Sequence, residues 1–273
     1  MRVCDVLLLR VLASYCHLVG DWMDRVPTGV KGLDELLGGG IPKKRCVLVV
    51  GSPGSGKTTL AMQFLREGAA REENGLYVTM DESPDQIKEN LSGFGWDLDR
   101  LEREGKLFFI DATPVRRVRS KDTHYSEQTV LLDTASVFPQ FTLKELIRTV
   151  HKVVDEEKIQ RIVVDPVTSI MLRYERTSSR RKATLVLFDA LQATGCTSLV
   201  VTELRTAMLD RAFQLEEFLS QGVILLHTIP HEGNIVKAIQ IEKMRGIPHD
   251  IQLRPYQITS EGIEVFSKDR VFH

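Results

Sequence analysis

The feature that most constrains this chain is a glycine-rich loop, Gly51-Ser-Pro-Gly-Ser-Gly56-Lys57-Thr58. It fits the pattern G-x-x-x-x-G-K-[ST] and stands between an apolar run, Cys46–Val50, and a helical pattern over Thr59–Glu67. In such a loop the backbone N–H groups and the helix N-terminus face an anion, the lysine reaches the β- and γ-phosphates, and the threonine serves Mg²⁺. The context favours a nucleotide-phosphate site over a purely structural turn, with contacts from Ser52, Pro53, Gly54, Ser55, Gly56, Lys57, Thr58 and Thr59.

Short apolar runs alternate with helical patterns along most of the chain, which is typical of a parallel sheet with crossover helices. Thr142 and Glu145 form a capping-box pattern before a helical apolar stripe that extends to Val154, and Ser83-Pro84 marks another helix start. A further helix is predicted over Ser179–Thr194. The predicted buried strands are Cys46–Val50, Leu76–Thr79, Leu107–Ile110, Ile162–Val164 and Ser198–Thr202.

The pattern changes after Gly222, where strand-like runs are separated only by short turns. These runs are Val223–Leu226, Ile235–Ile241, Tyr256–Thr259 and Ile263–Phe266. We therefore expect an α/β fold with a mainly parallel sheet flanked by helices and with antiparallel strands at its C-terminal end.

Acidic residues follow two of the predicted parallel strands, at the sheet edge where open α/β sheets bind ligands. Asp165 ends the hydrophobic run Arg161-Ile-Val-Val-Asp165. This is the Walker B arrangement, in which the carboxylate holds the Mg²⁺ shell opposite Thr58. The alternative is a strand-end aspartate that caps a turn. Asp81 and Glu82 come directly before the Ser83-Pro84 helix start. Glu82, helped by Asp81, could polarise the attacking water, or the pair could simply favour a helix N-terminus.

The composition is that of an ordinary globular protein of 273 residues, with 42% hydrophobic and 27% charged residues. With 36 basic and 37 acidic side chains the formal net charge is -1, so a general electrostatic attraction to nucleic acid or to an anionic membrane is not expected. The cysteines are scattered without metal-ligand spacing, which favours reduced thiols in a cytoplasmic protein over a zinc site. They are Cys4, Cys16, Cys46 and Cys196.

The first twenty residues are apolar, but Asp5, Arg10 and His17 interrupt them, so neither a membrane span nor a secretory signal is predicted. Two interpretations stay open: a short appended helix, or translation that begins at Met23. We divide the chain into an N-terminal extension (1–23), a principal domain (24–267) and a tail (268–273). The least patterned stretch, Thr113–Gln140, is predicted to be an exposed insertion.

Several motifs in register, added to the phosphate loop, resemble the KaiC-type ATPase domain of the RecA superfamily. The similarity extends over residues 24–267 and is far more specific than the phosphate loop alone. The resemblance implies a RecA-like P-loop fold, ATP and Mg²⁺ as cofactors, and action of Asp81 and Glu82 on the lytic water. The motifs are the lead-in Val26–Pro42, Tyr77–Pro84, Gly93–Leu98, Asp165–Ile170, Thr202-Glu203 and Lys243–Asp250.

The resemblance also implies a homo-oligomeric ring, usually of six subunits, with nucleotide at the interfaces. In the family a K-x-R-G motif on a late strand reaches the γ-phosphate of the neighbouring subunit, and Lys243 and Arg245 match it. The alternative for these two residues is a pair of solvated cations on an antiparallel strand. If the match holds, an isolated subunit has an incomplete active site.

The chain also departs from the circadian clock protein of this family, which carries two such domains and phosphorylates a Ser-Thr pair in the second. This chain has a single phosphate loop, and the matched positions are Glu217 and Phe218. Autokinase activity at those positions is therefore not expected. Clock function does not follow either, because a fold does not fix a biological role.

Two further functions remain as alternatives to a regulatory ATPase. One is a nucleic-acid-dependent RecA-type motor or recombination accessory protein, served by two basic clusters; few aromatic residues accompany them, and solvated faces or subunit salt links are favoured. The other is an ATP-dependent assembly switch or scaffold with slow turnover. The basic clusters are Arg116, Arg117, Arg119 and Lys121, and Arg173, Arg176, Arg180, Arg181 and Lys182.

Overall fold

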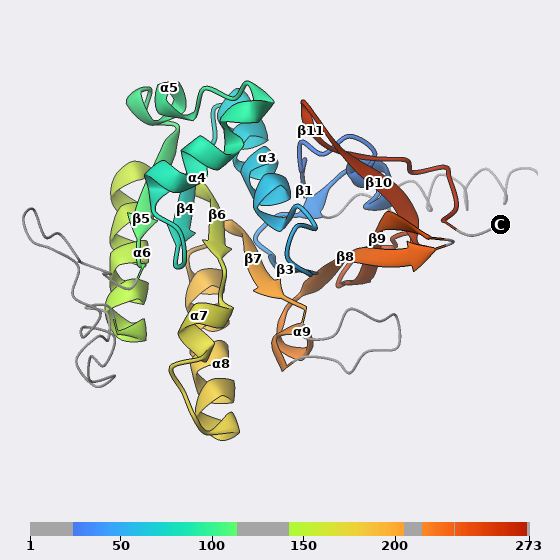
Figure 1. Ribbon diagram of the computed structural model, residues 1–273. Coiled ribbons are helices and arrows are strands. Elements are labelled where there is room, and N and C mark those ends of the chain that lie inside the picture. The colour runs from blue at the N-terminus through green and yellow to red at the C-terminus, as the bar shows by residue number, and fades with distance from the viewer. Residues whose placement is uncertain (1–23, 114–141, 205–214, 232, 272–273) are drawn as a thin grey trace, which may run out of the picture.

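The computed structural model describes residues 24–113, 142–204, 215–231 and 233–271. Within them nine strands form one sheet in the order β11-β10-β9-β8-β3-β7-β6-β4-β5 (Figure 1). The six strands from β8 to β5 pair in parallel, and β9, β10 and β11 continue the sheet as antiparallel strands. The predicted mixed sheet, with its antiparallel C-terminal end, is confirmed.

The strands of this sheet are β3 (Cys46–Gly51), β4 (Asn74–Thr79), β5 (Leu107–Asp111), β6 (Ile159–Asp165), β7 (Thr197–Glu203), β8 (Gly222–His231), β9 (Asn234–Met244), β10 (Arg254–Thr259) and β11 (Gly262–Val265). A small second sheet pairs β1 (Arg25–Val26) with β2 (Ile41–Pro42). The helices are α2 (Leu33–Leu36), α3 (Lys57–Ala70), α4 (Pro84–Leu91), the 3-10 turn η1 (Ser92–Phe94), α5 (Leu98–Arg103), α6 (Leu143–Glu157), α7 (Thr168–Met171), α8 (Thr177–Ala193) and α9 (Leu215–Leu219).

Strand β3 lies inside the sheet, and all six of its residues are buried. Its side chains alternate between two hydrophobic clusters because successive residues of a strand point to opposite faces. One cluster holds Val47 and Val49 with apolar residues of α3, α4 and α5. The other holds Leu48 and Val50 with apolar residues of α6, α7 and α8. Helices therefore cover both faces of the parallel part of the sheet.

The helix starts read from the sequence are confirmed. Thr142 and Glu145 form the reciprocal capping box of α6, and Ser83 caps α4 with Pro84 at its first position. The apolar stripe of α6 buries Leu146, Val150 and Val154 against the sheet. These local signals were readable because each satisfies backbone N–H groups that a helix leaves unpaired.

Most elements extend beyond the ranges predicted from apolar residues. For example, β6 begins at Ile159 rather than Ile162, because its backbone pairs with β4 whatever the polarity of the side chains. Four short helices, α2, α5, α7 and α9, and the β1–β2 pair were not predicted. The N-terminal extension (1–23) and most of the predicted insertion, with Arg116, Arg117, Arg119 and Lys121, lie outside the described residues.

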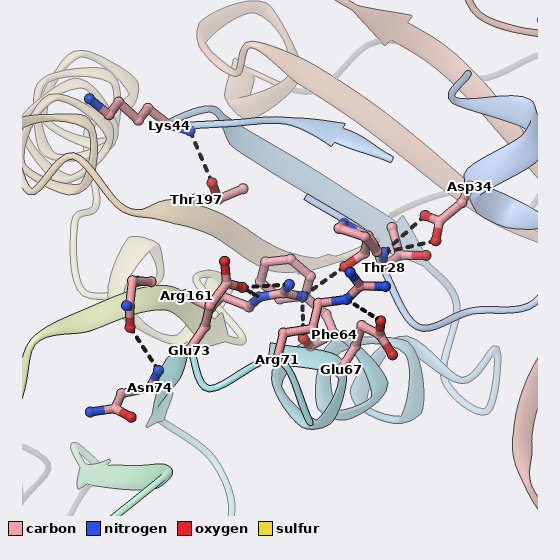
Figure 2. A network of polar contacts seen from close by, with 12 residues as sticks. Thr28, Asp34, Lys44, Phe64, Glu67, Arg71, Glu73, Asn74, Arg161 and Thr197 are labelled. Atoms are coloured by element: carbon pink, nitrogen blue, oxygen red, sulfur yellow. Dashed lines mark hydrogen bonds and ion pairs between the residues drawn. The ribbon is translucent and has the colours of Figure 1, made fainter. Parts of the chain in front are cut away.

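A buried arginine on β6, Arg161, contacts several segments that are distant in the sequence. The Arg161 side chain is 1% exposed; its Nε and Nη2 lie 2.7 and 2.6 Å from Glu73 Oε2. Its Nη1 donates to the carbonyls of Pro27 and Phe64 at 2.7 and 2.8 Å (Figure 2). Arg161 therefore links the lead-in segment, α3 and the turn before β4 to strand β6. This strand ends at Asp165, four residues after Arg161.

We predict that Glu73→Ala lowers the free energy of unfolding by about 3 kcal/mol, because it leaves the Arg161 charge buried without its carboxylate. Guanidinium unfolding of the nucleotide-free protein measures the change. Glu156→Ala is the matched control: it removes an exposed i,i+4 ion pair with Lys152 on α6, worth about 0.5 kcal/mol. Equal effects of the two substitutions would contradict a stabilising role for the buried pair.

Candidate functional site

The phosphate loop runs from the carboxyl end of β3 into the first turn of α3, as the sequence predicts. Gly56 stands at the N-cap of α3 with φ 91°, a left-handed conformation that favours glycine. A Cβ there would also lie 3.0 Å from methyl carbons of Ile258 and Ile263. The first turn of α3 contains no acidic residue, so the positive end of the helix dipole faces the loop unopposed.

The C-terminal antiparallel strands hold this loop from the side. Tyr256 on β10 donates its hydroxyl hydrogen bond to the carbonyl of Ser55 at 2.6 Å, and Lys237 on β9 donates to the carbonyl of Gly54 at 2.7 Å. On β8, Thr228 accepts a hydrogen bond from Ser52 at 3.2 Å. The carbonyls of Gly54 and Ser55 are thus bound by side chains of the antiparallel strands and do not compete for the backbone N–H groups that would face an anion.

Lys57 and Thr58, the first residues of α3, lie at the mouth of the loop. The Lys57 ammonium donates to the carbonyls of Gly51 and Ser52 at 2.9 and 3.0 Å. Burial lowers the pKa of Lys57, while the nearby carboxylates of Asp165 and Glu203 act in the opposite direction. A partly desolvated cation in this position is suited to bind phosphate oxygens.

Asp165, at the end of β6, meets Thr58 directly. The Thr58 hydroxyl donates to Asp165 Oδ2 at 2.8 Å, and the Tyr77 hydroxyl donates to the same oxygen at 2.5 Å. Burial raises the pKa of Asp165, while the two hydroxyl donors and Lys57 oppose that rise. Burial and the adjacent Asp165 charge also raise the pKa of Tyr77 well above its usual range.

This donor set fits a magnesium ion. A hydroxyl that donates its proton to a carboxylate keeps its own lone pairs for a cation, and Mg²⁺ prefers hard oxygen ligands with only one or two from the protein. Thr58 and Asp165 would hold the ion, directly or through its water shell. That Thr58 and Asp165 bind the ion stays a prediction.

Asp81 and Glu82 line the same pocket, which has a volume of about 130 Å³. Both are exposed and lie between β4 and α4. Asp81 accepts a hydrogen bond from the Ser169 hydroxyl, and Glu82 accepts one from the Asn90 amide at 2.8 Å. The pocket is lined by Lys57, Thr58, Tyr77, Thr79, Asp81, Glu82, Ile87, Asp165, Pro166 and Glu203.

Lys243 and Arg245 do not line this pocket. Lys243 pairs with Val223 at the start of β8, which lies level with the first half of β3, whereas the phosphate loop follows the end of β3. The Lys243 ammonium donates to the carbonyl of Glu217 at 2.6 Å. Burial, and then the positive charge of Arg245, lower the pKa of Lys243. Within one subunit these two cations are separated from the site.

Sequence reasoning did not assign several of the pocket residues to the site, and Glu203 and Tyr77 are two of them. Glu203 ends the buried strand β7 as Asp165 ends β6, so its position after an apolar run was a usable signal. Tyr77 lies within β4, where an aromatic residue is ordinarily core. Its hydroxyl reaches Asp165 because β4 pairs with β6, where Tyr77 stands opposite Val163, two residues before Asp165, and the sequence contains no sign of that pairing.

The second basic cluster lies around α7 and the start of α8. Arg176, Arg181 and Lys182 are exposed, whereas Arg173 and Arg180 are half-buried. Arg180 donates to the carbonyl of Tyr174 at 2.7 Å. Among the described helices, none is long and apolar enough to cross a membrane.

Comparison with known proteins places this site in a family. A family profile described as "ATPase: KaiC" matches residues 26–270. The chain belongs to the KaiC-type ATPase family. Its RecA-like P-loop fold and the resemblance seen in its motifs are thereby confirmed.

Relatives within the KaiC-type family differ in length and description. A UPF0273 protein of Methanopyrus kandleri is 34% identical over 252 residues, 92% of this chain and 94% of that protein. A circadian clock oscillator protein KaiC of Rippkaea orientalis is 34% identical over 89% of this chain, but the match spans only 44% of that longer protein. The solved structure of a KaiC-like protein from Pyrococcus horikoshii superposes with a TM-score of 0.73 at 31% identity, covering 89% of this chain and 99% of the other.

We predict that Asp165→Asn raises the free energy of unfolding of the nucleotide-free protein at pH 8 by on the order of 1 kcal/mol. Burial raises the pKa of Asp165 in the folded state, so the charged carboxylate destabilises that state as the pH rises through the folded pKa. At lower pH the folded carboxyl takes up its proton, and the gain should shrink. Denaturant unfolding between pH 4 and pH 8 measures it.

The matched control is Asp189→Asn, which removes the same charge from an exposed position on α8. It should change the unfolding free energy little at either pH. A destabilising effect of Asp165→Asn at pH 8 would contradict the burial cost.

Proposed function

We propose that this protein binds ATP with Mg²⁺ and hydrolyses the bond between the β- and γ-phosphates. The observation that carries the proposal is the convergence of Lys57, Thr58, Glu82 and Asp165 on one pocket beside the phosphate loop. Membership of the KaiC-type ATPase family supports it. The loop amides and Lys57 bind the phosphates, and Thr58 and Asp165 hold the metal. Bound Mg²⁺ supplies positive charge to the phosphate oxygens as charge develops on them.

Glu82 is the proposed residue that positions and polarises the attacking water. Its carboxylate lines the pocket and is held by Asn90, near the C-terminal end of α4. Asp81 faces the pocket beside it and is oriented by Ser169. Both carboxylates are held by neutral hydrogen-bond donors, and an oriented carboxylate suits a group that accepts a proton from water.

Lys243 and Arg245 are proposed to complete the site of a neighbouring subunit in a homo-oligomeric ring, usually a hexamer in this family. Their position supports this, because they lie level with the first half of β3, whereas their own phosphate loop follows the end of that strand. A cation supplied across an interface stabilises the charge of the transferred phosphoryl group and is worth roughly 10³–10⁵ in rate. An isolated subunit would then hydrolyse ATP slowly.

The resemblance to clock proteins further leads us to propose a regulatory or signalling role in the cytoplasm. A nucleic-acid motor is not favoured by any contact in the described residues. A switch with slow turnover uses the same site and differs from an active ATPase only in rate. The ATPase activity per subunit, measured against protein concentration while the molecular mass is followed, distinguishes the active ATPase from the switch. For an active ATPase the activity per subunit rises as the subunits assemble. For a switch it stays undetectable even in assembled rings.

Glu82→Gln should lower the hydrolysis rate at least about 100-fold while ATP binding is retained, because the amide cannot accept the proton of the attacking water. Steady-state phosphate release and equilibrium binding of a fluorescent ATP analogue provide the two readouts. Glu89→Gln makes the same chemical change on an exposed position of α4 and should leave both unchanged. Normal turnover by Glu82→Gln would remove Glu82 from this role.

Subunit complementation tests the interface. Lys57→Ala and Arg245→Ala should each be nearly inactive alone, because one lacks the phosphate contact and the other the cation given to its neighbour. Co-assembled in equal amounts, they should regain about a quarter of wild-type activity, since a head-to-tail interface pairs an intact loop with an intact cation at one site in four. Mixed assemblies no more active than their parents would place both groups in one subunit.

A further inference from the structure

The hydroxyl of Tyr77 belongs to a residue that lines the pocket and that the proposed chemistry does not yet use. Tyr77 is fully buried on β4, and its ring packs in the main hydrophobic cluster at 5.7 Å from the ring centre of Phe109. Only its hydroxyl reaches the pocket, where it donates to Asp165 Oδ2 at 2.5 Å. A buried tyrosine hydroxyl ordinarily finds a partner, but here the partner is the carboxylate opposite Thr58.

Two donors on one oxygen leave the other oxygen available. Thr58 and Tyr77 both donate to Oδ2, from α3 and from β4, on either side of Asp165. Oδ1 receives no hydrogen bond from the described residues. Two donors from different elements restrict the rotation of the Asp165 carboxylate, and its Oδ1 stays available to a further partner in the pocket that Asp165 lines. Thr58 alone would hold it less firmly, because a hydrogen bond from a single donor allows the carboxylate to rotate.

We propose that Tyr77 is a positioning residue for the metal: its hydroxyl fixes the Asp165 carboxylate so that Asp165 and Thr58 together present their oxygens to Mg²⁺. This inference rests on the proposed function and deepens it. Partners of this kind, one step removed from the ion, typically contribute 10–100-fold to metal affinity. Because the Tyr77 ring is fixed by packing in the core, the position of its hydroxyl is fixed, and the hydroxyl in turn orients the Asp165 carboxylate.

The test is Tyr77→Phe, which keeps the ring and removes only the hydroxyl. The affinity for a fluorescent ADP analogue is measured with EDTA and again with saturating Mg²⁺. We define the ratio as the nucleotide affinity with Mg²⁺ divided by the nucleotide affinity with EDTA. By linkage, the factor by which Tyr77→Phe lowers this ratio equals the factor by which it weakens Mg²⁺ binding in the complex of protein, nucleotide and metal. We expect unchanged affinity in EDTA and a ratio lowered about 10-fold. Tyr174→Phe, the same change at a half-buried residue outside the pocket, should leave the ratio unchanged.

A double-mutant cycle with Asp165→Asn shows whether Tyr77 acts through Asp165. If it does, adding Tyr77→Phe to Asp165→Asn changes the ratio less than twofold, because the group that Tyr77 positions is already altered. An additive 10-fold loss would overturn the inference, as would an unchanged ratio in Tyr77→Phe or equal losses with EDTA and with Mg²⁺. Absence of nucleotide binding by the wild-type protein would overturn the proposed function, and this inference with it.

Discussion

The site depends on the register of four parallel strands, β3, β7, β6 and β4. Gly51 pairs with Glu203, and Thr79 pairs with Asp165, so the ends of these strands come to one edge of the sheet. A slip of one residue would turn every side chain to the other face and carry Asp165 away from Thr58. Register is secured where both faces are buried, and the central strands are covered by helices on both sides. Hydrophobic packing therefore fixes the polar geometry.

Strand β9 serves two parts of the molecule. Near its start Lys237 binds the carbonyl of Gly54 in the phosphate loop. Six residues later, about 20 Å along the strand, Lys243 lies near the other end of β9. Between them the pairing shifts, so that Glu242 is an extra residue opposite Val223 and Ile224. A bulge of this kind re-aims the side chains that follow it. Strand β9 thus supports the phosphate loop of its own subunit through Lys237, and it places Lys243 away from that loop.

Local signals in the sequence were sufficient for much of this structure. The phosphate loop, the capping boxes and Asp165 after its apolar run could be read because each has a fixed spacing with a physical cause. Arg161 and Tyr77 could not, since both depend on neighbours distant in the sequence: Arg161 on Glu73 and Pro27, Tyr77 on Asp165. A charged or aromatic residue within a strand has many ordinary explanations, and only the assembled sheet shows which partner it meets. The roles of all the predicted site residues stay predictions, those of Lys57, Thr58 and Asp165 as much as those of Asp81, Glu82, Lys243 and Arg245.

Strand β6 carries two buried charges that the structure treats differently. Arg161 is neutralised by the Glu73 carboxylate and surrounded by carbonyl acceptors, an arrangement that stabilises a buried cation. Asp165, four residues on, is held by the hydroxyls of Thr58 and Tyr77. Hydroxyl donors orient a carboxylate without cancelling its charge, whereas a directly paired guanidinium would occupy the oxygens that a metal requires. Because their partners differ, Arg161 stabilises the fold, whereas Asp165 stays available to bind a cation.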